Sequence, residues 1–183
     1  MEIKEKVLTD AFVLKPRQFE DDRGYFYESF NELTLSERVG QKFNFVQDNQ
    51  SLSSKGTLRG LHFQKGEAAQ TKLVRVVTGA AYDVAVDLRT NSPTFKQWYG
   101  VELSESNHLQ FLIPRGFAHA FVALEEGTIF QYKVDNYYSS LHDGGIIWND
   151  EELNIEWPNL TLELSEKDKQ LPELNQLNLN TLW

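Results

Sequence analysis

Apolar and polar residues alternate along most of the chain, which is the pattern of half-buried β-strands. Such segments run from about residue 10 to residue 158, and turn residues separate them. They are rich in Val, Phe, Tyr and Leu, as pleated strands prefer. Two of them flank Asp21–Gly24 and predict a strand, a turn and a second strand. Many short strands with almost no helix favour a sandwich or barrel over a parallel α/β sheet.

One short helix and a C-terminal tail interrupt this strand pattern. The segment NELTLSERVG, residues 31–40, predicts a short surface helix that ends at a glycine, and FNFVQDNQSLS, residues 43–53, predicts a strand. The tail predicts short helix and loop packed against the barrel. We therefore expect a single domain over residues 1–183, with a barrel over residues 10–158 and a C-terminal helix and loop extension over residues 159–183.

Charge and cysteine content narrow the class of protein. The chain has 183 residues, a formal net charge of −9 and no cysteine. A broad nucleic-acid surface is basic, so nucleic acid is not an expected partner. The lack of cysteine excludes disulfides and thiolate chemistry and agrees with the cytoplasm. No apolar run approaches the roughly 18 residues of a membrane span, and the start, MEIKEKVLTDAF, has no apolar signal-peptide core. We expect a cytoplasmic protein without membrane contact.

The strand RGLHFQ, residues 59–64, places a histidine between two apolar residues. Because side chains alternate along a strand, His62 shares a polar face with Gln64, opposite Leu61 and Phe63. One interpretation is a core histidine that a carbonyl or carboxylate satisfies. The other is a general base, because imidazole titrates near neutral pH.

His119 and Tyr132 also have both a structural and a functional interpretation. His119 has the parity of Phe117 and Phe121 on its strand, which favours a supporting polar role. Tyr132 lies on the apolar face of its strand, where it is either a core aromatic with its hydroxyl at the rim or a proton donor. Tyr138, in a turn-like segment, is a weaker candidate for the donor.

The histidines make a poor metal site. The spacing of Pro114, Gly116 and His119 matches the second half-motif of metal-binding cupin barrels. Their first half-motif supplies two histidines and a later glutamate, whereas here His62 is followed by Gln64 at the second position. Two histidines without a thiolate hold a transition metal weakly, so we expect no metal.

Three aspartates can partner His62, and spacing alone does not choose between them. Asp83 and Asp87 share one strand face, and both need partners because aspartate is disfavoured in strands. Asp168 lies in a segment that predicts a helix or turn.

Separate cations suggest an anionic ligand. Arg23, Arg59 and Lys72, together with the amide side chains of residues 47–50, can hold such a ligand, and arginine suits phosphate. Strict alternation puts Arg59 and His62 on opposite strand faces. Both reach one site only if the strand begins after Arg59 or bends at the glycine that follows it.

Long, ordered motifs of this chain resemble the dTDP-4-dehydrorhamnose 3,5-epimerase family. The resemblance runs from about residue 10 to residue 172. It is carried by QDNQSLSSKGTLRGLHFQ, AQTKLVRVVTGAAYDVAVDLRTNSPTF, FLIPRGFAHAFVAL, YKVDNYYS, GIIWND and LSEKD. It implies a mostly β, cupin-type jelly-roll barrel with short peripheral helices, dimeric and without metal or other cofactor. The implied reaction inverts C3 and C5 of dTDP-4-dehydro-6-deoxy-glucose on the route to dTDP-L-rhamnose.

The resemblance also implies residue roles. His62 matches the proton acceptor, Asp168 its dyad partner, Tyr132 the proton donor and Lys72 a residue near the sugar. The matching ligand-binding positions are Arg23, Glu28, Gln47, Asp48, Asn49, Arg59, His119, Asp143 and Lys167. Asp143 stands where the family usually has glutamate, so its carboxylate is one methylene closer to the backbone. The thymine base needs an aromatic platform, for which Phe26 and Tyr138 are the candidates.

Three alternatives remain beside this reading. A sibling enzyme inverts only C3 or only C5, or acts on another deoxysugar nucleotide. A metal-dependent cupin isomerase or dioxygenase is a second, against which Gln64 argues. A non-catalytic sugar-nucleotide-binding barrel is the third, and the presence of His62, Tyr132, Lys72 and Asp168 argues against it.

Overall fold

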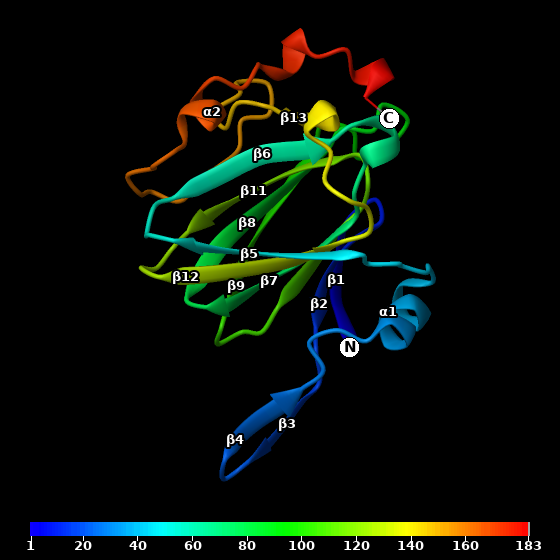
Figure 1. The fold of residues 1–183 in the computed structure, drawn as a ribbon, viewed down its shortest axis with the longest axis vertical. Helices are drawn as coiled ribbons and strands as arrows, with labels where there is room; N and C mark the ends of the chain where they lie inside the picture. Colours follow the sequence, from blue (N-terminus) through cyan, green and yellow to red (C-terminus); the bar gives the residue numbers. More distant parts are fainter. Residues whose placement is uncertain (183) are drawn as a thin grey trace.

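Two antiparallel sheets face each other in the computed structural model, which describes residues 1–182 (Figure 1). The six-stranded sheet has the order β1-β2-β10-β7-β12-β5. Its strands are β1 (Glu2–Leu8), β2 (Ala11–Lys15), β5 (Gln47–Ser53), β7 (Lys72–Thr78), β10 (Gln110–Ile113) and β12 (Thr128–Val134). The five-stranded sheet has the order β13-β6-β11-β8-β9. Its strands are β6 (Leu58–Gln64), β8 (Ala80–Asp87), β9 (Trp98–Ser104), β11 (Phe117–Ala123) and β13 (Asp143–Gly145).

Short helices decorate this barrel. They are α1 (Glu32–Val39), α2 (Glu166–Lys169) and the 3₁₀ turns η1 (Gly66–Ala68), η2 (Ser140–His142), η3 (Leu174–Gln176) and η4 (Leu179–Thr181). The predicted helix at residues 31–40 is confirmed, because Asn31 caps the N-terminus of α1 and Gly40 ends it in the left-handed conformation. Within residues 1–182, no helix has both the length and the apolar character that a membrane crossing needs.

The predicted strand at residues 43–53 is too long. β5 begins at Gln47, and the preceding Phe43 and Phe45 leave the sheet. Their rings stack at 5.8 Å between centroids and pack with Leu35 of α1 on the outer face of the six-stranded sheet. Burial of these rings under α1 therefore outweighs the strand pattern at this point.

The apolar residues form layers around a polar cavity. Val74, Phe111, Phe121 and Phe130 pack between the two sheets. A second cluster lies on the outer face of the five-stranded sheet, where the C-terminal tail covers it (Figure 1). Its members include Leu61 and Phe63 of β6 and Val84, Val86, Leu88, Leu174 and Leu182. The apolar face of β6 thus faces the tail, and its polar face is left for the space between the sheets.

A two-stranded hairpin projects away from the barrel (Figure 1). It consists of β3 (Gln18–Asp21) and β4 (Gly24–Tyr27), as the sequence predicts around Asp21–Gly24. Its base is tied to the six-stranded sheet, where Arg75 donates a hydrogen bond to the Tyr27 hydroxyl at 3.2 Å. The apolar side chains toward its tip are exposed to solvent.

Candidate active site

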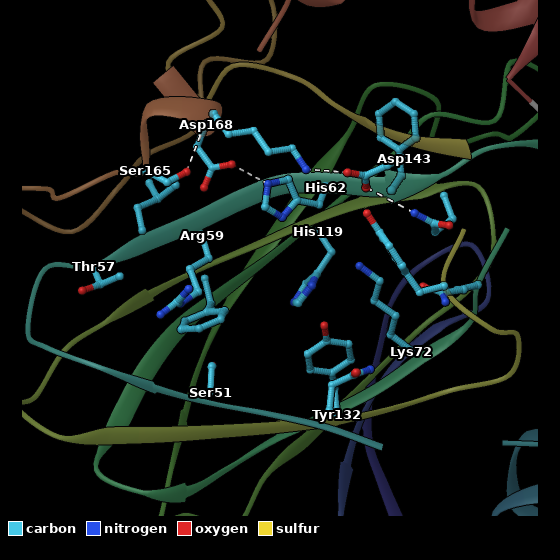
Figure 2. Close-up of a pocket in the computed structure, with 18 of the residues that line it drawn as sticks. Ser51, Thr57, Arg59, His62, Lys72, His119, Tyr132, Asp143, Ser165 and Asp168 are labelled. Atoms are coloured by element: carbon cyan, nitrogen blue, oxygen red, sulfur yellow. Dashed lines mark hydrogen bonds and ion pairs between the residues drawn. The ribbon is translucent and has the colours of Figure 1, made fainter. Parts of the chain in front are cut away.

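A cavity of about 490 Å³ opens between the two sheets. Predicted site residues from both sheets and from the tail line it, as Figure 2 shows for the labelled ones. These residues are Asn49, Arg59, His62, Lys72, His119, Tyr132, Tyr138, Asp143, Lys167 and Asp168. Strands β5, β6, β7, β11, β12 and β13 and helix α2 thus bring together groups that lie more than a hundred residues apart in the sequence.

An irregularity in β6 brings Arg59 and His62 to the same cavity. Across β11, His62 pairs with His119 and Arg59 with Phe121, so Gly60 and Leu61 of β6 together oppose the single residue Ala120 of β11. Gly60 lies in this bulge with φ of 127°, and a Cβ there would come within 2.6 Å of the Ala120 backbone. Only glycine fits this position. The strand therefore bends at Gly60, one of the two solutions that the sequence allows.

Asp168 is the carboxylate that contacts His62. Ser165 caps the N-terminus of α2 by accepting a hydrogen bond from the Asp168 amide at 3.1 Å. This cap holds the Asp168 carboxylate at 2.6 Å from Nε2 of His62 (Figure 2). Asp168 is buried, and about a third of the His62 side chain is exposed to the cavity. A hydrogen bond from Nε2–H to Asp168 leaves the lone pair on Nδ1 as the free basic position.

The surroundings of Asp168 keep it ionised. Burial raises the pKa of its carboxyl, but hydrogen bonds from His62, Ser165 and the Gly60 backbone outweigh burial and hold that pKa below its ordinary value. An ionised Asp168 stabilises the imidazolium that forms if His62 accepts a proton.

Lys72 and Tyr132 lie on the opposite wall of the cavity. They come from the neighbouring strands β7 and β12, and the Lys72 ammonium lies 6.0 Å from the centroid of the Tyr132 ring. Burial raises the pKa of the Tyr132 hydroxyl, which Arg59 lowers to a smaller extent, so the phenol keeps its proton at neutral pH. Burial also lowers the pKa of Lys72 to about 8.

The three candidate aspartates have different partners. Asp168 contacts His62, whereas Asp83 lies 2.8 Å from Nε2 of His119. Asp87 instead binds the Arg89 guanidinium at 2.8 Å at the far end of β8. Asp83 and His119 come from the adjacent strands β8 and β11, and both are buried.

A polar bridge crosses the mouth of the cavity. Asp143 forms an ion pair with Lys167 and accepts a hydrogen bond from Gln64 Nε2 at 3.2 Å (Figure 2). Gln64 Oε1 in turn accepts from the Ser139 amide at 2.8 Å. The position at which metal-binding barrels carry a second histidine is thus occupied by an amide with two hydrogen bonds. Residues 1–182 contain no group of three His, Asp or Glu side chains arranged to hold a metal ion.

Four predicted binding residues lie outside this cavity. Gln47 supports its edge, because it donates to Asn49 at 2.8 Å and accepts from the Tyr138 amide at 3.3 Å. Asp48 faces the outer side of the sheet and pairs with Lys133 at 2.8 Å.

Arg23 and Glu28 belong to the projecting hairpin. Arg23 pairs with Asp21 at 2.6 Å in the turn and is almost fully exposed. Glu28 follows β4 and accepts a hydrogen bond from Asn31 at 3.2 Å. One chain therefore does not bring these two residues to its own cavity.

Comparison with known proteins agrees with the geometry. The family model described as dTDP-4-dehydrorhamnose 3,5-epimerase matches residues 5–176. The chain belongs to this family. The epimerase of Salmonella typhimurium is 55% identical over 170 residues, covering 92% of this chain and 93% of the relative.

Solved structures of the epimerase family superimpose closely. The Bacillus anthracis dTDP-4-dehydrorhamnose 3,5-epimerase, solved with TDP and PPi bound, is 56% identical, has a TM-score of 0.91 and covers 94% of this chain and 99% of its own. The Legionella pneumophila dTDP-6-deoxy-D-glucose-3,5-epimerase, solved in complex with dTDP-4-keto-L-rhamnose, is 43% identical and has a TM-score of 0.94. The match covers 99% of this chain and 96% of the Legionella chain. The predicted mostly β, cupin-type jelly roll is confirmed.

Sequence reasoning missed several residues around this epimerase cavity. Ser165, Phe121 and Gln70 line it. Asp83 was a candidate partner of His62, and it supports the cavity through His119 instead. The signal for Asp83 was present, since an aspartate inside a strand needs a partner. Neither strand parity nor spacing could show that this partner is a second histidine.

Proposed function

We propose that this chain inverts C3 and C5 of dTDP-4-dehydro-6-deoxy-glucose and so forms dTDP-4-dehydro-L-rhamnose, the precursor of dTDP-L-rhamnose. The family membership supports the reaction, and one observation carries the mechanism: His62 and Tyr132 come from opposing sheets and line the same cavity. An isomerase of this kind needs a base and an acid on the two faces of one sugar ring.

His62 acts as the base in this mechanism. The C4 ketone acidifies the hydrogens on C3 and C5, and Nδ1 of His62 removes one of them while Nε2–H stays bonded to Asp168. The resulting imidazolium is stabilised by the ionised carboxylate at 2.6 Å. A positioned base of this kind contributes about 10²–10⁴-fold to the rate.

Tyr132 and Lys72 act on the opposite face. The electron pair of the broken C–H bond moves to the C4 oxygen, and the Lys72 ammonium stabilises this enolate. Tyr132 then returns a proton to carbon from the face opposite His62, which inverts the centre. The raised pKa of the phenol keeps that proton available. His62 then gives its proton to solvent and Tyr132 takes one from solvent, so the same pair serves the second centre after the ring has shifted.

The cations at the rim of the cavity bind the nucleotide. Arg59 and Lys167 flank the His62 side of the cavity and can receive the diphosphate, to which arginine binds in a bidentate manner. Tyr138 is more than half exposed at the mouth and offers a face to the thymine base. Asp143, although shorter than the usual glutamate, lies in the same cavity and exchanges its Lys167 partner for a ligand group.

A second copy of the chain supplies Arg23 and Glu28 in this proposal. Both lie on the hairpin, away from their own cavity, and the exposed Phe19, Tyr25 and Phe26 make the hairpin surface apolar. In a homodimer each hairpin reaches the cavity of its partner and places Arg23 beside the diphosphate. The homodimer stays a prediction from the resemblance, and the cytoplasmic location stays a prediction from the composition.

NMR of the dTDP-4-keto sugar in D₂O, coupled to a dTDP-4-dehydrorhamnose reductase, tests the function. We expect deuterium at both C3 and C5 and a reduced product of rhamnose configuration. Deuterium at one carbon only would replace the double epimerase by a single-centre sibling. No exchange, with tight nucleotide binding, would favour the non-catalytic barrel.

A substitution of His62 tests its role in the same assay. We expect His62→Asn to reduce exchange at both carbons by at least about 10²-fold, because the base is lost, while the affinity for dTDP changes little. His142→Asn is the matched control, since His142 ends the 3₁₀ turn η2 and bonds to Ser139 at 2.8 Å. Comparable turnover by His62→Asn would remove His62 from the mechanism.

A further inference from the structure

Beneath the cavity lies a second His–Asp pair, which the mechanism above does not use. Asp83 has no exposed surface, and its Oδ2 lies 2.8 Å from Nε2 of the buried His119. The other oxygen, Oδ1, is buried without a hydrogen-bond partner among residues 1–182. A buried carboxylate with one unsatisfied oxygen is costly, so this charge needs a compensating cation nearby.

Lys72 is the buried cation whose pKa this carboxylate raises. Among residues 1–182 its buried ammonium forms neither an ion pair nor a hydrogen bond, and in Figure 2 it points into the same part of the cavity as His119 and Tyr132. The burial that lowers the pKa of Lys72 is opposed by the charges of Asp83 and then Asp143. The other titratable groups that line the cavity are Arg59, His62, His119, Tyr132, Tyr138, Lys167 and Asp168.

We propose that Asp83 is a positioning residue for the epimerisation: its buried charge keeps the unpaired Lys72 protonated at the enolate site and fixes the tautomer of His119. The catalytic consequence rests on the proposed function. The electrostatic coupling does not rest on that function: it is argued from the burial of Asp83, His119 and Lys72, from the 2.8 Å contact between Asp83 and His119, and from the effect of the Asp83 charge on the pKa of Lys72.

The bond to Asp83 determines what His119 presents to a ligand. Burial lowers the pKa of His119, Asp83 raises it, and the charges of Lys72 and His62 lower it further; the net shift is downward, so the ring is neutral at neutral pH. A neutral ring whose Nε2–H donates to Asp83 has a bare Nδ1. His119 therefore accepts a hydrogen bond from a sugar hydroxyl and does not compete with Lys72 for the ketone oxygen.

NMR titration of Lys72 tests the coupling without turnover. Protein labelled with ¹³C at lysine Cε, assigned with Lys72→Met, reports the midpoint of Lys72, which we expect at about 8 in the wild type. Asp83→Asn keeps an acceptor for His119 but removes the charge, and we expect the Lys72 midpoint to fall by about one unit. An unchanged midpoint in folded Asp83→Asn protein would overturn the proposal.

Asp87→Asn is the matched control. Asp87 is equally buried, on the same strand and the same face, but its charge is taken up by Arg89. Loss of this carboxylate destabilises the protein and leaves the Lys72 midpoint unchanged. If the Lys72 midpoint fell in both Asp83→Asn and Asp87→Asn, the effect would come from loosened packing, and a specific role for Asp83 would be contradicted.

A reciprocal measurement does not depend on the folding of the Asp83 variant. Because coupling between two sites is mutual, Lys72→Met must raise the midpoint of His119, read from the ¹³Cε1 shift of labelled histidine. A His119 midpoint that stays in place shows that the dyad and Lys72 do not sense each other, and the proposal fails.

Kinetics then separates this inference from the proposed function. If the wild type turns over, we expect the alkaline limb of its kcat/KM profile to move to lower pH by about one unit in Asp83→Asn, as the Lys72 midpoint does. The affinity for dTDP changes little. A limb that stays in place contradicts the positioning role. If the wild type does not turn over, the proposed function is wrong. The two NMR titrations then still decide whether Asp83, His119 and Lys72 are coupled.

Discussion

Tyr132 and Lys72 lie on one wall of the cavity, and burial favours the neutral form of both. For Tyr132 this keeps the proton that an acid must donate, since the pKa of the phenol lies above its usual value. For Lys72 it acts against the charge that an enolate needs, since the pKa of the amine falls to about 8. Burial in this wall therefore keeps Tyr132 protonated at neutral pH, and it leaves the charge of Lys72 dependent on nearby carboxylates.

Removal of the Tyr132 hydroxyl separates the two half-reactions. We expect Tyr132→Phe to exchange substrate hydrogen with D₂O through His62 but to form inverted product at least about 10²-fold more slowly, because the acid is absent. NMR of the recovered sugar measures exchange and configuration together.

Tyr99→Phe is the control for this substitution. Tyr99 is also partly buried, but its hydroxyl donates to Glu5 at 2.9 Å, away from the cavity. Its product formation should match the wild type. Unchanged inversion by Tyr132→Phe would assign the acid to another group.

Lys72 gives the wild-type enzyme an alkaline limit. Because the ammonium is the active form and its pKa is about 8, we expect kcat/KM to fall as the pH rises above that value. Tyr132 does not set this limit, since its pKa is raised above the ordinary value of about 10. A pH–rate profile from pH 6 to about 10 measures the limb. A flat profile through pH 9 would remove the Lys72 charge from the rate-determining chemistry.

At the scale of strands, alternation predicts faces well and register poorly. The polar face of β6 and the apolar face that meets the tail follow from Leu61, His62 and Phe63 alone. The bulge at Gly60 does not, because it depends on the close approach of β11 to that glycine. The partner of His62 lies 106 residues away, on a short capped helix that only the fold brings into reach.

The loop between β8 and β9 is held by one buried carboxylate. Asp87 accepts hydrogen bonds from the Arg89 guanidinium at 2.8 Å, from Ser92 at 2.5 Å and from Thr94 at 2.7 Å. Burial raises the pKa of Asp87, but these bonds outweigh burial and lower the pKa below its ordinary value. The carboxylate thus closes the loop onto the end of β8 and favours the folded state only while it is ionised.

The stability contributed by Asp87 depends on pH. Its folded pKa is depressed, so the contribution is present above the unfolded value of about 3.9 and is lost as the pH falls through the folded value. We expect Asp87→Asn to lower the free energy of unfolding by about 2 kcal/mol at pH 7, with a difference that narrows toward pH 3.

Urea denaturation at several pH values measures this difference. Asp48→Asn is the control, since its exposed pair with Lys133 is worth less than about 1 kcal/mol. A loss at Asp87→Asn that stays constant down to pH 3 would contradict the assigned pKa shift.

At the scale of the molecule, one chain forms the proposed catalytic cavity but not the whole predicted ligand site. The two sheets and the tail bring His62, Lys72, Tyr132 and Asp168 to one cavity. The hairpin carries Arg23 and Glu28 away from it (Figure 1). The sequence resemblance assigned all six residues to one ligand, and no pattern within a single sequence shows which of them come from a second copy.

Mixed dimers test whether the hairpin works in the partner's cavity. One chain carries His62→Asn with an intact hairpin, and the other carries Arg23→Ala and Phe26→Ala with an intact His62. We expect each variant alone to lose at least about tenfold in kcat/KM. In a mixed dimer, the intact hairpin of the first chain meets the intact cavity of the second, so one of its two sites is complete. Random exchange then restores about a quarter of the wild-type sites.

The same mixture distinguishes the other arrangements. If each hairpin served its own chain, no site in the mixture would be complete, and turnover would stay at the mean of the two separate variants. A monomer in solution would give the same result, and sedimentation velocity separates the two cases. Within residues 1–182 Arg23 is bound only to Asp21, and the exposed Phe26 meets the ring of Phe19 on the same hairpin. The loss of both side chains therefore leaves the barrel intact, and a failure of complementation cannot be assigned to misfolding.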